Sequence, residues 1–217
     1  MSLALREERA GVPERMRALI LDGPERFHLG EVPVPRPGPY EVLCRVHAVA
    51  ICGTDVHIIE GRHPGQWPRE YPFIAGHEWS GEVVEAGQMA AAFGWRPGQR
   101  VAGTSHAGCG FCRMCREGRY NLCENYGRPE LGHRQYGHYS QGAYAEYVVH
   151  SIKSVFPLPE ALSLDEGALA DASSIALWSA ERGGVGPGDR VAVVGAGPMG
   201  ILVAQSARVM GAAQVLV

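Results

Sequence analysis

The sequence predicts an all-β domain followed by the start of an α/β domain, and three observations indicate this. Glycine and proline together make up about a fifth of the 217 residues, a composition that suits short strands joined by tight turns. Short apolar stretches, broken by these two residue types, continue to about Val155. Beyond Leu162, apolar residues recur at helical spacing, and a glycine-rich turn then separates a valine-rich strand from a second helix.

The first expected strand begins at Met16, where the apolar pattern Ala-Leu-Ile-Leu starts. Residues 1–15 are charged and lack an apolar core, so we expect an extension or a cloning remnant rather than a secretory signal. Further strands are expected at Glu41–Ile51, Trp79–Glu85 and Ala143–Val149, the last of which alternates with a period of two.

The second part of the chain reads as a β-α-β unit preceded by a helix. Ser163 followed by Glu166 is typical of a capped helix start, and the glycines of residues 183–189 end that helix. A strand at Arg190–Val194, a helix at Met199–Met210 and a strand opening at Gln214 follow. We therefore divide the chain into residues 16–172 and residues 173–217.

Composition excludes several classes of protein. The formal charge is −3, which provides no basic face for nucleic acid. The chain contains no apolar run of the roughly 18 residues that a membrane helix needs. We expect a soluble, cytoplasmic protein without nucleic-acid or membrane partners.

Four of the six cysteines crowd together at the spacing of metal ligands, C-x2-C-x2-C-x7-C. Four thiolates can close a tetrahedral shell around Zn²⁺ and leave no open position, so the role of such a site is structural. An iron–sulfur cluster also uses four cysteines, and the spacing alone leaves that alternative open. The predicted ligands are Cys109, Cys112, Cys115 and Cys123.

A second metal site is indicated by Cys52, in Ile-Cys-Gly-Thr-Asp-Val-His, and His77, in Gly-His-Glu-Trp-Ser-Gly. One thiolate and one imidazole supply two of the three protein ligands of an open, catalytic zinc site, where an alcohol oxygen can bind. Taken singly, a cysteine of this kind is more often a small buried hydrophobe.

The pattern Gly76-His77-Glu78-x2-Gly81-x5-Gly87-x2-Ala90 resembles the signature of zinc-containing alcohol dehydrogenases of the medium-chain dehydrogenase/reductase family. The cysteine cluster has that family's structural-zinc spacing, and the glycine loop lies where its cofactor loop belongs. The resemblance extends from about Arg17 to Val217. It implies a GroES-like β-barrel catalytic domain followed by a Rossmann cofactor domain that is incomplete in this chain.

The resemblance also implies roles for individual residues. Cys52 and His77 resemble the catalytic-zinc ligands, and Glu78 the glutamate behind the metal that approaches it during ligand exchange. Thr54 resembles the hydroxyl that passes on the substrate proton, and His57 a later member of that relay. Structural readings of Thr54 as a turn residue and of His57 as a surface histidine stay open.

The third protein ligand in the family is a cysteine or a glutamate just before the helix that enters the cofactor domain. This chain has Asp171 there, and aspartate is a competent zinc ligand, although it is one methylene shorter. We favour ligation by Asp171. A solvated side chain, or one that reaches zinc through water, is the alternative.

The loop Gly195-Ala-Gly197-Pro198-Met199-Gly200 follows a valine-rich strand and opens a helix. In that context the first glycine makes the turn, the second lets a pyrophosphate approach and the third packs helix on strand. The loop therefore predicts binding of NAD or NADP. The acidic residue that distinguishes them is expected roughly 20 residues further on, where the chain ends.

We expect an oxidoreductase that uses two zinc ions, one catalytic and one structural, to transfer a hydride between an alcohol and NAD(P). The flanks of Cys52 and the acidic third ligand resemble polyol and threonine dehydrogenases. The complete protein is expected to be a homodimer or homotetramer, and the 217-residue chain alone to be inactive. A non-enzymatic zinc-binding fragment is the alternative, while Cys52, His77 and the cysteine cluster argue against a zinc-free quinone reductase.

Overall fold

The computed structural model describes residues 11–65 and 67–217. The expectation for the first ten residues therefore lies outside the described part. The centre of the first domain is a five-stranded antiparallel sheet with the order β8-β3-β4-β5-β9. Its strands are β3 (Glu41–Ala50), β4 (Glu78–Ala86), β5 (Arg100–Gly103), β8 (Tyr147–Ser151) and β9 (Val155–Pro157).

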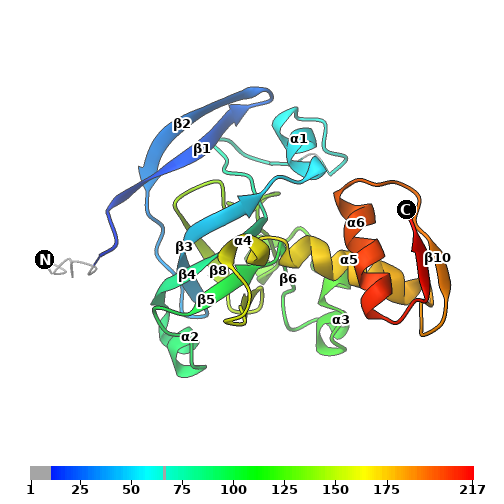
Figure 1. Ribbon diagram of the computed structural model, residues 1–217. Coiled ribbons are helices and arrows are strands. Elements are labelled where there is room, and N and C mark those ends of the chain that lie inside the picture. The colour runs from blue at the N-terminus through cyan, green and yellow to red at the C-terminus, as the bar shows by residue number, and fades with distance from the viewer. Residues whose placement is uncertain (1–10, 66) are drawn as a thin grey trace, which may run out of the picture.

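A long hairpin, β1 (Arg15–Gly23) and β2 (Arg26–Pro33), projects beside this sheet (Figure 1). Single bridges connect β1 to Ala145 and to Phe73. The small pair β6 (His106–Ala107) and β7 (Arg134–Gln135) carries the lobe that contains the four cysteines. Short helical segments connect these strands: α1 (Gly53–Ile59), α2 (Gln88–Ala92), α3 (Arg113–Arg116), η1 (Tyr120–Leu122) and η2 (Pro129–Leu131).

The core of the first domain lies against β3 and β4. Trp79, Val42 and Val101 are fully buried there, together with Cys44. Because β4 supplies part of this core, the residues at its start are held by packing on both sides of the strand. The expected strands at Glu41–Ile51 and Trp79–Glu85 are confirmed by β3 and β4 within one residue at each end.

The expected strand at Ala143–Val149 is only partly present, since β8 starts at Tyr147. The backbone of residues 142–146 bonds instead to three different segments, which are residues 74–76, β1, and Val46 in β3. Tyr144 donates its N–H to Ala75, while its carbonyl accepts the N–H of Leu19 in β1. A segment shared among three neighbours has no continuous ladder, which is why alternation alone overestimated this strand.

The helix expected from Ser163 is divided into α4 (Leu164–Gly167) and α5 (Ala170–Arg182). The cap is as predicted: Ser163 Oγ accepts the N–H of Glu166, whose carboxylate accepts the N–H of Ser163. The domain boundary predicted at residue 172 falls inside α5, and it stays a prediction.

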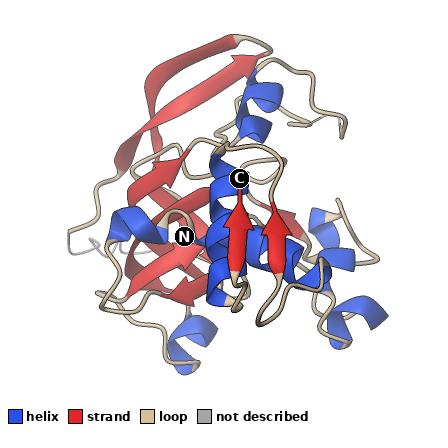
Figure 2. Cartoon of the chain, turned by 45° about the vertical axis from the view of Figure 1, so that its right-hand side comes forward, coloured by secondary structure: helices blue, strands red, loops and turns tan. Residues whose placement is uncertain are grey.

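The β-α-β unit consists of β10 (Arg190–Ala192), α6 (Pro198–Val209) and β11 (Gln214–Leu216), and the two strands pair in parallel (Figure 2). Helix α5 extends from the sheet to α6 and packs against it (Figure 1). The structure thus confirms a β domain followed by the first part of an α/β fold.

Candidate metal centres and cofactor loop

The four sulfur atoms of Cys109, Cys112, Cys115 and Cys123 form one group, in which all lie within 4.8 Å of one another. The Sγ atoms of Cys109 and Cys115 are 3.9 Å apart, as are those of Cys112 and Cys123. A tetrahedral shell with Zn–S bonds of about 2.3 Å has edges of about 3.8 Å. All four thiols are free, and their arrangement fits a zinc ion.

Backbone N–H groups surround these sulfurs. Those of Phe111 and Cys112 both point to Sγ of Cys109 at 3.4 Å, and the amide of Asn125 does so at 3.4 Å. Burial opposes ionisation of Cys109, but these donors outweigh it and lower its pKa to about 6. These donors favour the thiolate of Cys109, the form that binds metal.

A second group comprises Cys52, His77 and Glu78, with one ligand atom from each within 4.8 Å of the others. Cys52 is the N-cap of α1, His77 directly precedes β4, and Glu78 is its first residue. Gly76 makes the connection possible, because it adopts φ +88° and a Cβ there would lie 2.8 Å from the ring of Tyr144. Two segments distant in sequence thus converge on a thiol, an imidazole and a carboxylate.

Asp55 completes this group from behind, and the sequence reasoning missed it. It is 1% exposed, and its Oδ1 lies 3.3 Å from Nδ1 of His77. Neither atom meets hydrogen-bond geometry with any partner among the described residues. A carboxylate behind a metal-binding histidine fixes its tautomer and orientation. The position of Asp55 three residues after Cys52, a capping-box spacing, was the available signal.

The charges of Asp55 and Cys52 favour a positive charge at His77. Burial lowers the pKa of His77, but Asp55 and Cys52 outweigh it and raise that pKa to about 10. The hydrogen bond with His77 and those with Thr54 lower the pKa of Cys52, against the effect of its burial. A metal bound by an imidazole and a thiolate fits this site. Nδ1 of His77 is buried beside the carboxylate of Asp55, and the pKa of the Cys52 thiol is lowered.

Asp171 does not belong to the group of mutually close ligand atoms. Its side chain is buried at the start of α5, and its Oδ1 accepts the backbone N–H of Ser105 at 3.2 Å. Burial raises the pKa of Asp171, while the Ser105 bond and the charge of His77 lower it. Asp171 is therefore near enough for its charge to act on His77, and its ligation stays a prediction.

The two residues expected in a proton relay lie on α1. Thr54 is half-buried and interacts with Cys52. His57 lies on the exposed side of the helix, where its Nδ1 is 3.9 Å from Oε2 of Glu60. The structure brings Thr54 to the metal group and leaves His57 at the surface.

The glycine loop has the predicted strand–turn–helix setting. Gly195 adopts φ +105°, Gly197 is the N-cap of α6, and Pro198 is its first residue. A Cβ at Gly200 would overlap the carbonyl oxygen of Gly195, whereas one at Gly197 would meet no atom within 4 Å. The third glycine thus serves packing, and the second leaves space at the helix N-terminus, where a phosphate binds favourably.

No helix among the described residues is long and apolar enough to cross a bilayer.

Comparison with known proteins places these features in context. The model of the alcohol dehydrogenase GroES-like domain matches residues 38–160. The chain is 34% identical over 209 residues to the sorbitol dehydrogenase of Bacillus subtilis, and the matched region covers 95% of this chain and 56% of that protein. It is 41% identical over 187 residues to the L-threonine 3-dehydrogenase of Anaeromyxobacter dehalogenans, covering 86% and 51% respectively. The chain thus spans about half the length of the curated relatives it matches.

Solved structures give the same result. A thermostable alcohol dehydrogenase from Pyrobaculum aerophilum with cobalt and zinc bound matches with a TM-score of 0.80 and 35% identity, over 93% of this chain and 58% of that one. A chain from Sinorhizobium meliloti assigned as a zinc-binding dehydrogenase and solved with NADP matches with a TM-score of 0.81 and 34% identity, over 94% and 56%.

Proposed function

Since this chain belongs to the zinc-containing alcohol dehydrogenase family, through its GroES-like domain, we propose that the whole protein is a zinc-dependent NAD(P) oxidoreductase. It transfers a hydride between nicotinamide and a secondary alcohol, polyol or hydroxy-amino acid. The sorbitol and threonine dehydrogenases among the relatives support this substrate class. The protein would act on a small molecule, in the cytoplasm, as a homodimer or homotetramer.

The observation that carries the proposal is the presence of two separate ligand groups with different chemistry. Four sulfurs form one group, which leaves no position for a substrate. The other has one thiol, one imidazole and one carboxylate beside it, the mixed set of an open site. This second group would hold a zinc ion, which would supply Lewis-acid activation of the substrate hydroxyl.

The side chains of this protein have distinct tasks in the proposal. Cys52 and His77 would hold the metal. Glu78 would supply the third ligand, because its carboxylate lies in the same group of close ligand atoms. The sequence predicts Asp171 for that role. Asp55 holds the His77 ring in orientation. Thr54, close to Cys52, would accept the proton of the substrate hydroxyl as it gives its own hydroxyl proton to the next group of the route. His57 at the surface would be the last proton acceptor before solvent.

The cofactor is held by the loop at the start of α6. Gly195 turns the chain, Gly197 leaves the backbone open to a pyrophosphate, and the N-terminus of α6 attracts its charge. Pro198 and Met199 are the first residues of that helix and would flank the phosphates.

The test is metal content together with hydride transfer in the complete protein. Two zinc ions per chain and alcohol-dependent reduction of NAD or NADP, measured at 340 nm with sorbitol and L-threonine as first substrates, are expected. One zinc ion per chain and no reduction with any alcohol would instead favour the non-enzymatic zinc-binding alternative.

A further inference from the structure

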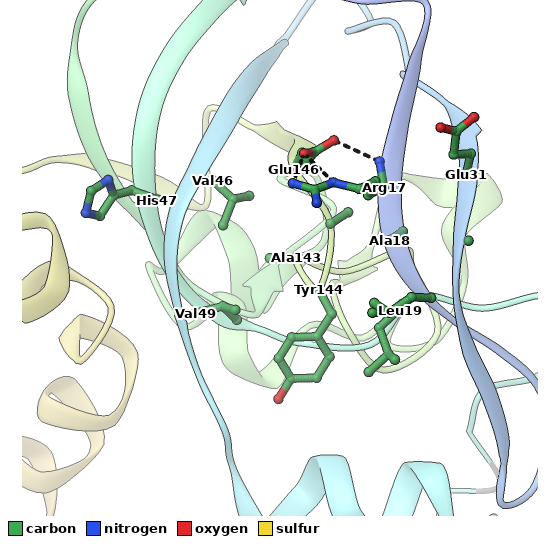
Figure 3. A pocket seen from close by; sticks show the side chains of 13 residues that line it. Arg17, Ala18, Leu19, Glu31, Val46, His47, Val49, Ala143, Tyr144 and Glu146 are labelled. Atoms are coloured by element: carbon green, nitrogen blue, oxygen red, sulfur yellow. Dashed lines mark hydrogen bonds and ion pairs between the residues drawn. The ribbon is translucent and has the colours of Figure 1, made fainter.

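Tyr144 lies behind the proposed catalytic metal site, although it is 89 residues from Asp55 in the sequence. Its ring forms part of the wall of a cavity of about 520 Å³ between the β1–β2 hairpin and β3 (Figure 3). In that view the ring points away from the Arg17–Glu146 ion pair at the other end of the cavity. The hydroxyl of Tyr144 points out of the cavity and donates a hydrogen bond to Oδ2 of Asp55 at 2.7 Å.

The two oxygens of Asp55 are thereby distinguished. Oδ2 accepts both the Tyr144 hydroxyl and the backbone N–H of Cys52, at 2.7 Å and 2.9 Å. Oδ1 accepts neither and lies 3.3 Å from Nδ1 of His77. Two donors on one oxygen prevent the carboxylate from rotating, so its other oxygen stays directed at the histidine.

Tyr144 is itself held rigidly. Its N–H donates to Ala75 at 3.0 Å and its carbonyl accepts the N–H of Leu19 at 2.8 Å. The ring packs so closely on Gly76 that a Cβ there would lie 2.8 Å away. The residue thus contacts the segment that carries His77 and also the carboxylate that orients its ring.

We propose that Tyr144 is a positioning residue for the Cys52–His77 metal site, acting through Asp55. This inference rests on the proposed function, because it assumes that zinc binds there. Removing an outer hydrogen-bond partner of a metal-ligating histidine costs about 10- to 100-fold in metal affinity. The Tyr144 hydroxyl bonds Asp55 and does not bond His77 itself. We therefore expect its loss to lower zinc affinity by the smaller of these factors, about tenfold.

The experiment measures zinc release from the complete protein into a chromophoric chelator. Wild type should release zinc in two phases, one for each site. Tyr144→Phe keeps the ring and should accelerate the phase of the Cys52–His77 site about tenfold, while the phase of the cysteine cluster stays unchanged. Tyr136→Phe is the matched control, because the Tyr136 hydroxyl accepts the N–H of Ser151 at 2.8 Å, outside both ligand groups. It should leave both phases unchanged.

A double-mutant cycle tests whether the effect passes through Asp55. In an Asp55→Asn background, Tyr144→Phe should add little further acceleration, since the oriented carboxylate is already lost. Full additivity would overturn the inference, as would release from Tyr144→Phe at the wild-type rate or equal acceleration of both phases. Cys52→Ala distinguishes the premise: if it leaves zinc content unchanged, the proposed function itself is wrong and the inference falls with it.

Discussion

Oδ1 of Asp171 accepts the backbone N–H of Ser105 at 3.2 Å, so this buried carboxylate is anchored to the segment between β5 and β6. Glu78, by contrast, belongs to the group of mutually close ligand atoms. We therefore expect Glu78→Gln to lower the zinc content of the Cys52–His77 site more than Asp171→Asn does. Zinc per chain after dialysis against a weak chelator measures this. The opposite ranking would favour Asp171 as the third ligand.

The two proposed zinc sites share no residue, so their variants should behave differently. Cys52→Ala should remove one zinc ion per chain and leave thermal stability little changed. Cys112→Ser should also remove one zinc ion but lower the melting temperature strongly, because a structural zinc contributes directly to folding. Metal analysis and thermal denaturation of both variants check this. Full zinc retention by Cys112→Ser would contradict the structural site.

Two glycines of the cofactor loop should respond differently to alanine. Gly200→Ala should destabilise the second domain, since the new Cβ overlaps the carbonyl of Gly195. Gly197→Ala meets no atom within 4 Å, so the fold should persist while NAD(P) binding weakens at least tenfold, about 1.4 kcal/mol. Thermal denaturation and cofactor titration of the complete protein separate these outcomes. Unchanged cofactor affinity in Gly197→Ala would exclude this loop as the phosphate site.

The cap of α4 provides a test of local stability. Ser163→Ala removes the hydroxyl that accepts the N–H of Glu166 and should lower the free energy of unfolding by about 1 kcal/mol. Ser179→Ala is the control, because its hydroxyl bonds the carbonyl of Ile175 within α5 and does not cap the helix. Urea denaturation of both variants measures the difference. Equal effects would show that the Ser163–Glu166 pair adds nothing as a cap.

His150 should make stability depend on pH. It is fully buried, and burial lowers its pKa from 6.5 to about 3. Below pH 6.5 the unfolded chain binds a proton that the folded chain does not, so the free energy of unfolding falls as pH falls.

His150→Gln keeps a hydrogen-bond acceptor for Nε1 of Trp79, which donates to Nε2 of His150 at 3.2 Å, but it does not titrate. Between about pH 6 and pH 5, its stability should fall less steeply than that of wild type, by up to about 1.4 kcal/mol per pH unit. Urea denaturation across this range gives both slopes. Parallel slopes would mean that His150 is not the group responsible.

The sequence by itself determined the features that depend on local spacing. Each of these features lies within a short segment of the sequence: the four cysteines, the Ser163–Glu166 cap and the glycine loop. Residue type and interval are therefore sufficient to predict them, because the short backbone segments between their members can adopt few conformations. The strands β3 and β4 followed from apolar patterning for the same reason.

Only the tertiary structure decided which distant side chains join Cys52 and His77, the pair that the family signature predicts. Asp55 and His77 are brought together by packing between α1 and the segment before β4, and Tyr144 reaches Asp55 from a segment 89 residues away. The sequence likewise places Asp171 at the family's third-ligand position, whereas the fold anchors its carboxylate on Ser105 and brings Glu78 to the ligand group. Such contacts depend on how elements pack, and residue spacing carries no information about packing between elements far apart in the chain.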